Sequence, residues 1–97
     1  MKPALAEKVA VVTGGGSGIG HATVLAMAAA GARIAIADVS VAAGSALAEH
    51  IVAQGGEAFF QPTDVADVAS VEALFDAVVQ RWGRLDCAFK IGRASGR

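Results

Sequence analysis

The chain of 97 residues is long enough for one small domain or for part of a larger one. Hydrophobic residues make up 55% of the sequence and charged residues 18%, which excludes an intrinsically disordered chain, and the net charge of −1 argues against nucleic acid as the main partner. A single cysteine, Cys87, excludes an internal disulfide and fits a reducing compartment, so we expect a cytoplasmic protein.

The first half of the chain alternates between patterns typical of strands and of helices. Residues 8–13, "KVAVVT", are rich in β-branched residues and predict a buried parallel strand. Five glycines follow within residues 14–20, and apolar residues at helical spacing then predict a helix that Gly31 ends. Residues 33–38, "RIAIAD", predict a second strand. A second helix is expected from about residue 41 to residue 54, ending at Gly55 and Gly56.

The second half continues the same alternation. Residues 57–61, "EAFFQ", predict a third strand, and Asp67 is placed to cap a third helix that ends at Gly83. Residues 85–89, "LDCAF", predict a fourth strand. This alternation indicates βαβ units and a parallel sheet of the α/β class. The third helix carries a wide apolar stripe made of Val68, Val71, Leu74, Phe75, Val78, Val79 and Trp82.

The glycines between the first strand and the first helix suit the binding of a phosphate group. Glycine permits positive φ and lets backbone N–H groups approach an anion, which the positive end of the following helix dipole also stabilises. A P-loop is disfavoured, because His21 and Ala22 follow the last glycine where that motif has Lys and Ser or Thr. The strict G-x-G-x-x-G pattern fails as well. The pattern T-G-x-x-x-G-x-G fits, at Thr13, Gly14, Gly18 and Gly20.

Four segments in order resemble the N-terminal part of the short-chain dehydrogenase/reductase family: "TGGGSGIG", "IAIAD", "TDVAD" and "RLDCAF". The resemblance extends over nearly all of the chain up to Phe89. It implies a Rossmann-type doubly wound parallel sheet, here partial, with about four strands in the order 3-2-1-4 and three helices. It also implies a nicotinamide dinucleotide as cofactor, with Gly14, Ser17, Gly18, Ile19 and Gly20 on the adenine-ribose and pyrophosphate side. The alternative is a glycine-rich turn without a ligand.

Two aspartates extend this candidate site. Asp38 lies at the end of the second strand, eighteen residues after Gly20, where a carboxylate accepts hydrogen bonds from both ribose hydroxyls and repels a 2′-phosphate. We therefore predict NAD rather than NADP, with a helix-capping or solvated aspartate as the alternative. By resemblance, the Asp64 side chain and the Val65 backbone contact the adenine ring. The alternative for Asp64 is a residue that organises the turn before the third helix.

The resemblance implies hydride transfer between nicotinamide and an alcohol or carbonyl substrate. The family's catalytic serine and Tyr-x-x-x-Lys pair map onto no position here, and the chain contains no tyrosine. We therefore predict a cofactor-binding half that is inactive alone, with a small-molecule substrate only in a full-length relative. The alternative is a non-catalytic dinucleotide-binding module or pseudoenzyme. No spacing suggests a metal site, and residues 22–32, the longest largely apolar stretch, are too short to span a membrane.

The end of the chain differs from the rest. Residues 90–97, "KIGRASGR", carry three basic residues, while residues 1–89 carry five basic and nine acidic residues, a balance of −4. We predict a partial NAD-binding domain over residues 1–89 and an atypical basic tail over residues 90–97. A shift of the reading frame by one base would explain the tail, since the shifted codons allow a sequence close to the family's continuation. An uncovered fourth strand would also allow self-association through the sheet edge.

Overall fold

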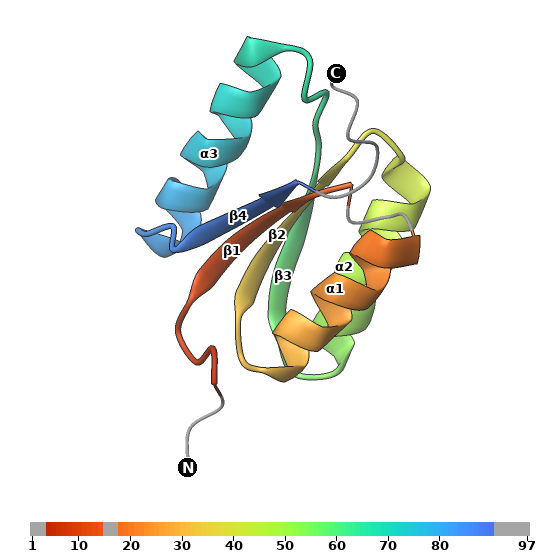
Figure 1. The fold of residues 1–97 in the computed structure, drawn as a ribbon, viewed down its shortest axis with the longest axis vertical. Coiled ribbons are helices and arrows are strands. Elements are labelled where there is room, and N and C mark those ends of the chain that lie inside the picture. Colours follow the sequence, from red (N-terminus) through yellow and green to blue (C-terminus); the bar gives the residue numbers. More distant parts are fainter. Residues whose placement is uncertain (1–3, 15–17, 91–97) are drawn as a thin grey trace.

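The computed structural model describes residues 4–14 and 18–90. Strands and helices alternate along the chain (Figure 1). Their bounds are β1 (Val9–Thr13), α1 (Gly18–Ala29), β2 (Arg33–Asp38), α2 (Val41–Ala53), β3 (Glu57–Pro62), α3 (Val68–Trp82) and β4 (Cys87–Lys90). Residues 91–97 of the predicted basic tail lie outside the described residues.

The four strands form one parallel sheet in the order β3-β2-β1-β4. Val11 in the middle of β1 pairs with Ala35 of β2 on one side and with Ala88 of β4 on the other. Helices α1 and α2 cover one face of the sheet and α3 lies on the opposite face (Figure 1). The predicted α/β class, the strand order 3-2-1-4 and the three helices are all confirmed.

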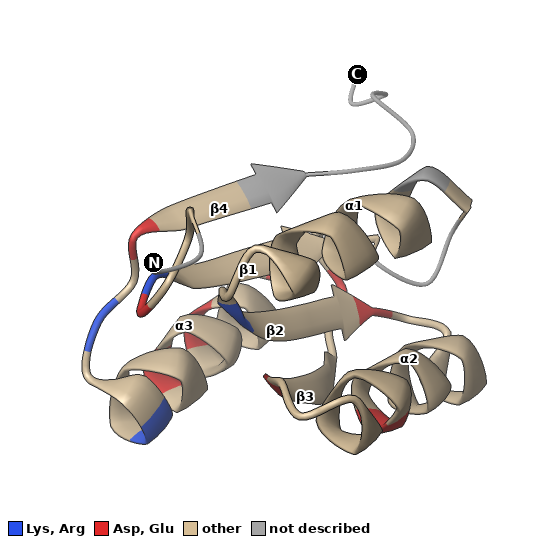
Figure 2. Cartoon of the chain, turned by 90° about the horizontal axis from the view of Figure 1, so that it is seen from below, with Lys and Arg blue, Asp and Glu red and all other residues tan. Residues whose placement is uncertain are grey.

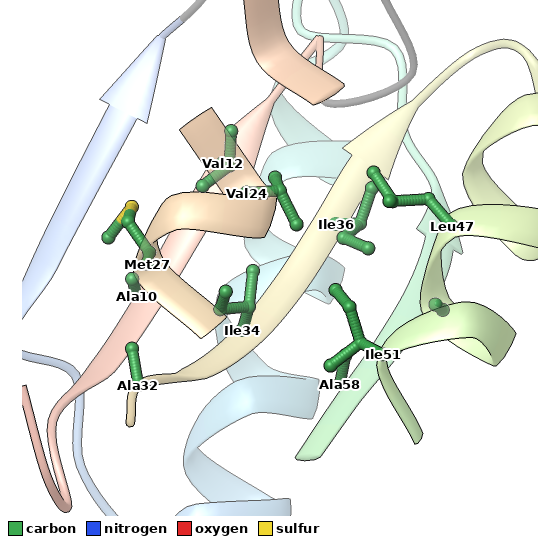
Figure 3. Packing of buried hydrophobic residues seen from close by; sticks show 11 residues of the cluster. Ala10, Val12, Val24, Met27, Ala32, Ile34, Ile36, Leu47, Ile51 and Ala58 are labelled. Atoms are coloured by element: carbon green, nitrogen blue, oxygen red, sulfur yellow. The ribbon is translucent and has the colours of Figure 1, made fainter. Parts of the chain in front are cut away.

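Successive strand residues point to opposite faces, so each strand contributes to two cores. The core beneath α1 and α2 joins strand residues such as Ile34 and Ile36 to Val24, Leu47 and Ile51 of the helices (Figure 3). The core beneath α3 is smaller and is formed by Val9, Val11, Ala35, Ala37, Leu74 and Val78. Burial on both faces explains why β1 and β2 are apolar almost without interruption.

The predicted helix ends have clear causes in the structure. The Asp67 side chain caps α3 by accepting a hydrogen bond from the Ala69 N–H at 3.0 Å. Gly83 follows α3 with a φ of 76°, and Gly55 follows α2 with a φ of 93°, a region of backbone conformation that favours glycine. No helix within residues 4–14 and 18–90 has the length and apolar character needed to cross a membrane.

The fourth strand begins later than the sequence pattern predicts. Pairing with β1 starts at Cys87, because the preceding residue, Asp86, closes the end of the ladder with both its backbone and its side chain. Its N–H donates to the Val9 carbonyl at 2.9 Å, and its Oδ2 accepts from the Val9 N–H at 2.8 Å. β4 is outermost in the described sheet, and Cys87 at its start is only half-buried.

The apolar stripe of α3 is broader than the surface it covers. Only Leu74 and Val78 of the seven predicted residues are buried, whereas Val68 is 72% exposed and Val79 is 51% exposed. Phe75 and Trp82 pack partly against the core beneath α3. The α3 stripe is thus wider than a single contact with the sheet requires.

Candidate functional site

The carboxyl ends of the strands bring the predicted site residues to one edge of the sheet. Because β1 and β2 are parallel, Thr13 pairs with Ala37, and the Gly14 N–H donates to the Ala37 carbonyl at 2.7 Å. Gly14 therefore lies beside the end of β2, where Asp38 is the last residue. The end of β3 is joined to the same place, since the Thr63 N–H donates to the Asp38 carbonyl at 3.0 Å.

Gly14 and Gly18 are the described residues on either side of the segment that connects β1 to α1. Gly14 has a φ of 74°, and α1 begins at Gly18. A Cβ added to Gly18 would meet nothing within 4 Å, so packing inside the chain does not require this glycine. The unpaired N–H groups and the positive dipole end of α1 lie at this start of the helix, the kind of position that attracts an anion.

The three remaining residues of the predicted turn are described to different extents. Ser17 lies outside the described residues, and Ile19 is described only as backbone within α1. Gly20 is buried in the first turn of α1.

Asp38 is half-buried at the carboxyl end of β2. Its Oδ1 accepts a hydrogen bond from the Ser40 N–H at 3.2 Å, so the carboxylate also organises the turn before α2. Val39, the residue between them, is 71% exposed. Figure 2 shows the charge along this strand: β2 starts with a basic residue, Arg33, and ends with an acidic one. Asp38 is thus an acidic group at the edge where the glycine turn lies.

Asp64 and Val65 follow β3 in an exposed loop. The Asp64 Oδ1 accepts from the Ala66 N–H at 2.9 Å, and the Asp64 carbonyl accepts from the Asp67 N–H at 2.9 Å. Through these contacts Asp64 organises the turn before α3, which was the alternative interpretation of this residue. Val65, the next residue, is 52% exposed.

The sequence pattern does not single out two further residues of this edge, Thr63 and Ser70. Thr63 is buried, and its hydroxyl donates to the Gln61 carbonyl at 3.0 Å. Ser70, in the first turn of α3, accepts the Asp64 N–H on its Oγ at 3.0 Å. A serine so close to a helix start is a weak sequence signal, because serine is common there for local capping.

The opposite edge of the sheet carries a second polar cluster. Asp86 accepts hydrogen bonds from Arg84, at 2.6 Å and 3.0 Å, and from the Val9 N–H. The Arg84 guanidinium, and after it the Val9 N–H, hold the pKa of the Asp86 carboxyl below its usual range. The same pairing raises the pKa of Arg84. This cluster fixes the start of β4 against the start of β1.

A groove of about 580 Å³ also opens at the amino ends of β2 and β3. It is lined by the last turns of α1 and α2 and by Glu7, Arg33 and Glu57, and the last two form an ion pair at 3.3 Å. The groove is therefore separate from the edge where Asp38 and Asp64 lie. Among the described residues, no group of three or more His, Cys, Asp or Glu side chains is placed to hold a metal ion.

A parallel β3-β2-β1-β4 sheet, helices on both faces and a glycine turn after β1 together define a Rossmann-type protein. Residues 8–90 match the family described as short chain dehydrogenase. The chain belongs to the short-chain dehydrogenase/reductase family.

Individual relatives show the same family relationship. The chain is 44% identical over 85 residues to a 2,5-dichloro-2,5-cyclohexadiene-1,4-diol dehydrogenase of Sphingobium indicum, covering 88% of this chain and 33% of that protein. It is 38% identical over 93 residues to levodione reductase of Leifsonia aquatica, covering 94% and 35% of the two chains. The structure is also similar to the crystal structure of a short-chain dehydrogenase/reductase from Burkholderia phymatum in complex with NAD. The TM-score is 0.84 at 35% sequence identity, and the match covers 88% of this chain and 30% of that chain. The chain therefore spans about a third of the length of these relatives.

Proposed function

We propose that this chain forms the cofactor-binding part of an NAD-dependent oxidoreductase that acts on an alcohol or carbonyl substrate. The observation that carries the proposal is the position of the Asp38 carboxylate, at the carboxyl end of β2 and beside the positive-φ turn at Gly14. Family membership and the similarity to a relative crystallised with NAD support it.

The preference for NAD over NADP follows from charge. A 2′-phosphate on the adenosine ribose would bring its negative charge next to the Asp38 carboxylate. The two residues that follow, Val39 and Ser40, are uncharged and offer no compensating cation. A ribose with both hydroxyls free instead donates hydrogen bonds to the carboxylate.

The rest of the cofactor is assigned to the neighbouring turns. We assign the adenine-ribose and pyrophosphate side of the cofactor to Gly14, Ser17, Gly18, Ile19 and Gly20, and the adenine ring to the Asp64 side chain and the Val65 backbone. When bound, the nicotinamide would supply the hydride acceptor or donor. The contribution of this chain is to bind and orient the dinucleotide through the edge formed by β1, β2 and β3.

We also propose that the chain alone binds NAD without turnover. The hydroxyl proton of an alcohol needs a base, and the family uses a tyrosine, a residue that this chain lacks. The same observation favours the second candidate function, a dinucleotide-binding module without chemistry of its own. We further propose that the chain self-associates through β4, the outermost strand of the described sheet. We also propose a cytoplasmic location.

Isothermal titration calorimetry with NAD and NADP tests the cofactor assignment. We expect NAD to bind at least tenfold more tightly than NADP. The Asp38→Ala variant should lose about 10- to 100-fold in NAD affinity, the equivalent of roughly 1.5 to 3 kcal/mol for hydrogen bonds to a charged group. Asp76→Ala, which removes an exposed carboxylate on α3, is the matched control and should leave both affinities unchanged. Equal or tighter binding of NADP would overturn the assignment.

Turnover is measured separately by following NADH absorbance with a panel of primary and secondary alcohols. We expect no absorbance change with the chain alone. Reduction of NAD above the rate of a protein-free control would contradict the predicted inactivity while leaving the binding proposal intact.

A further inference from the structure

The loop between β3 and α3 uses most of its own backbone donors internally. Asp64 donates its N–H to the Ser70 Oγ at 3.0 Å, Ala66 donates to the Asp64 Oδ1 at 2.9 Å, and Asp67 donates to the Asp64 carbonyl at 2.9 Å. Within the part of the chain that the structure describes, the Val65 N–H has no acceptor. The loop thus leaves one amide donor, at Val65, for an external group.

Ser70 has a contact that differs from an ordinary helix cap. The start of α3 is already capped by Asp67, which accepts the Ala69 N–H at 3.0 Å. The Ser70 hydroxyl instead reaches back six residues to the Asp64 amide. Its hydrogen bond therefore fixes the loop rather than the helix.

The other end of the same loop is fixed to the strand that carries Asp38. Thr63 is 4% exposed, and its N–H donates to the Asp38 carbonyl at 3.0 Å. Asp64 follows directly, so it lies between the Thr63 contact and the Ser70 contact. These two hydrogen bonds set the position of Asp64 and Val65 relative to Asp38.

We propose that Ser70 is a positioning residue for adenine recognition. Its hydroxyl holds the loop so that the Asp64 carboxylate and the Val65 N–H act together on one ligand edge. The Asp64 carboxylate is a hydrogen-bond acceptor and the Val65 N–H is a donor. Adenine has the complementary pair on one edge, an amine beside an unprotonated ring nitrogen. The inference rests on the proposed function, because it deepens the assignment of the adenine ring to this loop.

The first test needs no ligand. Amide hydrogen exchange by NMR on the whole chain should show faster exchange at Asp64 in Ser70→Ala, by several-fold, and a return toward the wild-type rate in Ser70→Thr, which keeps the hydroxyl. The Ser45→Ala variant in α2 is the matched control and should leave the Asp64 rate unchanged. Unchanged exchange at Asp64 in Ser70→Ala would overturn the proposal, whatever the cofactor result.

The second test measures recognition with AMP and IMP. IMP presents a carbonyl where adenine has its amine, and an N–H where adenine has an acceptor, so the wild-type chain should prefer AMP. We expect Ser70→Ala to bind AMP about fivefold more weakly and to lose most of this preference, and Ser70→Thr to restore it. A purely structural role would weaken AMP and IMP equally, and that result would overturn the proposal.

The two tests separate the failure of this inference from the failure of the proposed function. If the wild-type chain binds neither NAD nor AMP, the cofactor assignment fails and the role of Ser70 in adenine recognition fails with it. If the wild-type chain binds both and Ser70→Ala binds them equally well, only the inference about Ser70 fails.

Discussion

Gly44 in α2 lies directly against the aromatic ring of Phe60 in β3. A Cβ added to Gly44 would lie 2.1 Å from the Phe60 Cε1, 2.2 Å from Cδ1 and 3.0 Å from Cζ. All three distances are well inside van der Waals contact, so Gly44→Ala must displace either the ring or the helix. Overpacking of this kind lowers the free energy of unfolding by about 3 kcal/mol at the upper end of its range. The higher helix propensity of alanine raises it by about 1 kcal/mol. We expect a net loss of about 2 kcal/mol in the free energy of unfolding.

A double-mutant cycle tests this reasoning more sharply than the single variant. Phe60→Val removes all three atoms of the clash and keeps a side chain that suits a strand. In that background only the helix propensity remains, so Gly44→Ala should stabilise the chain by about 1 kcal/mol. The coupling between the two positions is then about 3 kcal/mol.

Urea unfolding followed by far-ultraviolet circular dichroism measures the four variants of the cycle. The decisive result is the change of sign between the two backgrounds. An equal loss for Gly44→Ala with Phe60 and with Val at position 60 would refute the steric argument.

The remaining predictions concern the ends of β4 and α3. The pKa of Asp86 is lowered in the folded chain, chiefly by the Arg84 side chain, so its contribution to stability is present above the unfolded pKa and is lost as the pH falls below about 4. The urea midpoint of the wild-type chain should therefore fall as the pH is lowered below about 4, and the midpoint of Asp86→Asn should fall less steeply. The same pH dependence in both proteins would contradict this prediction. In Gly83→Ala the added Cβ would have no atom within 4 Å, but the backbone keeps a φ of 76°. Backbone strain alone should therefore lower the free energy of unfolding by about 1 kcal/mol. Gly83→Asn should cost less, and equal losses would argue against backbone strain. Partial burial, and after it the Asp86 charge, raises the pKa of the Cys87 thiol, so labelling by iodoacetamide should be slower in the folded chain than in urea.

The parts of the site that depend on local pattern could be predicted from the sequence. A β-branched run followed by glycines places Gly14 at the end of a strand, and the strand "RIAIAD" places Asp38 at the end of the next. Parallel pairing then brings both to one edge without any further information. The helix cap at Asp67 and the helix end at Gly83 are equally local, and both are confirmed.

The parts that depend on distant partners could not be predicted. The Ser70 contact with Asp64 exists because the loop folds back, which periodicity does not show. The start of β4 depends on hydrogen bonds between Val9 and Asp86, two residues 77 positions apart. In α3, periodicity correctly gives the direction of the apolar side. It does not show how much surface lies opposite, and Val79 is consequently half exposed.

The contact between Val9 and Asp86 joins residues 77 positions apart, so it forms only late in the synthesis of the described chain. The ribosome synthesises β1, β2 and β3 before β4, so during that interval the edge of β1 that later pairs with β4 has unpaired backbone amides and carbonyls. Only the arrival of residues 87–90 covers this edge. Until then β1, a strand with three valines, exposes an edge of the kind that promotes association between chains.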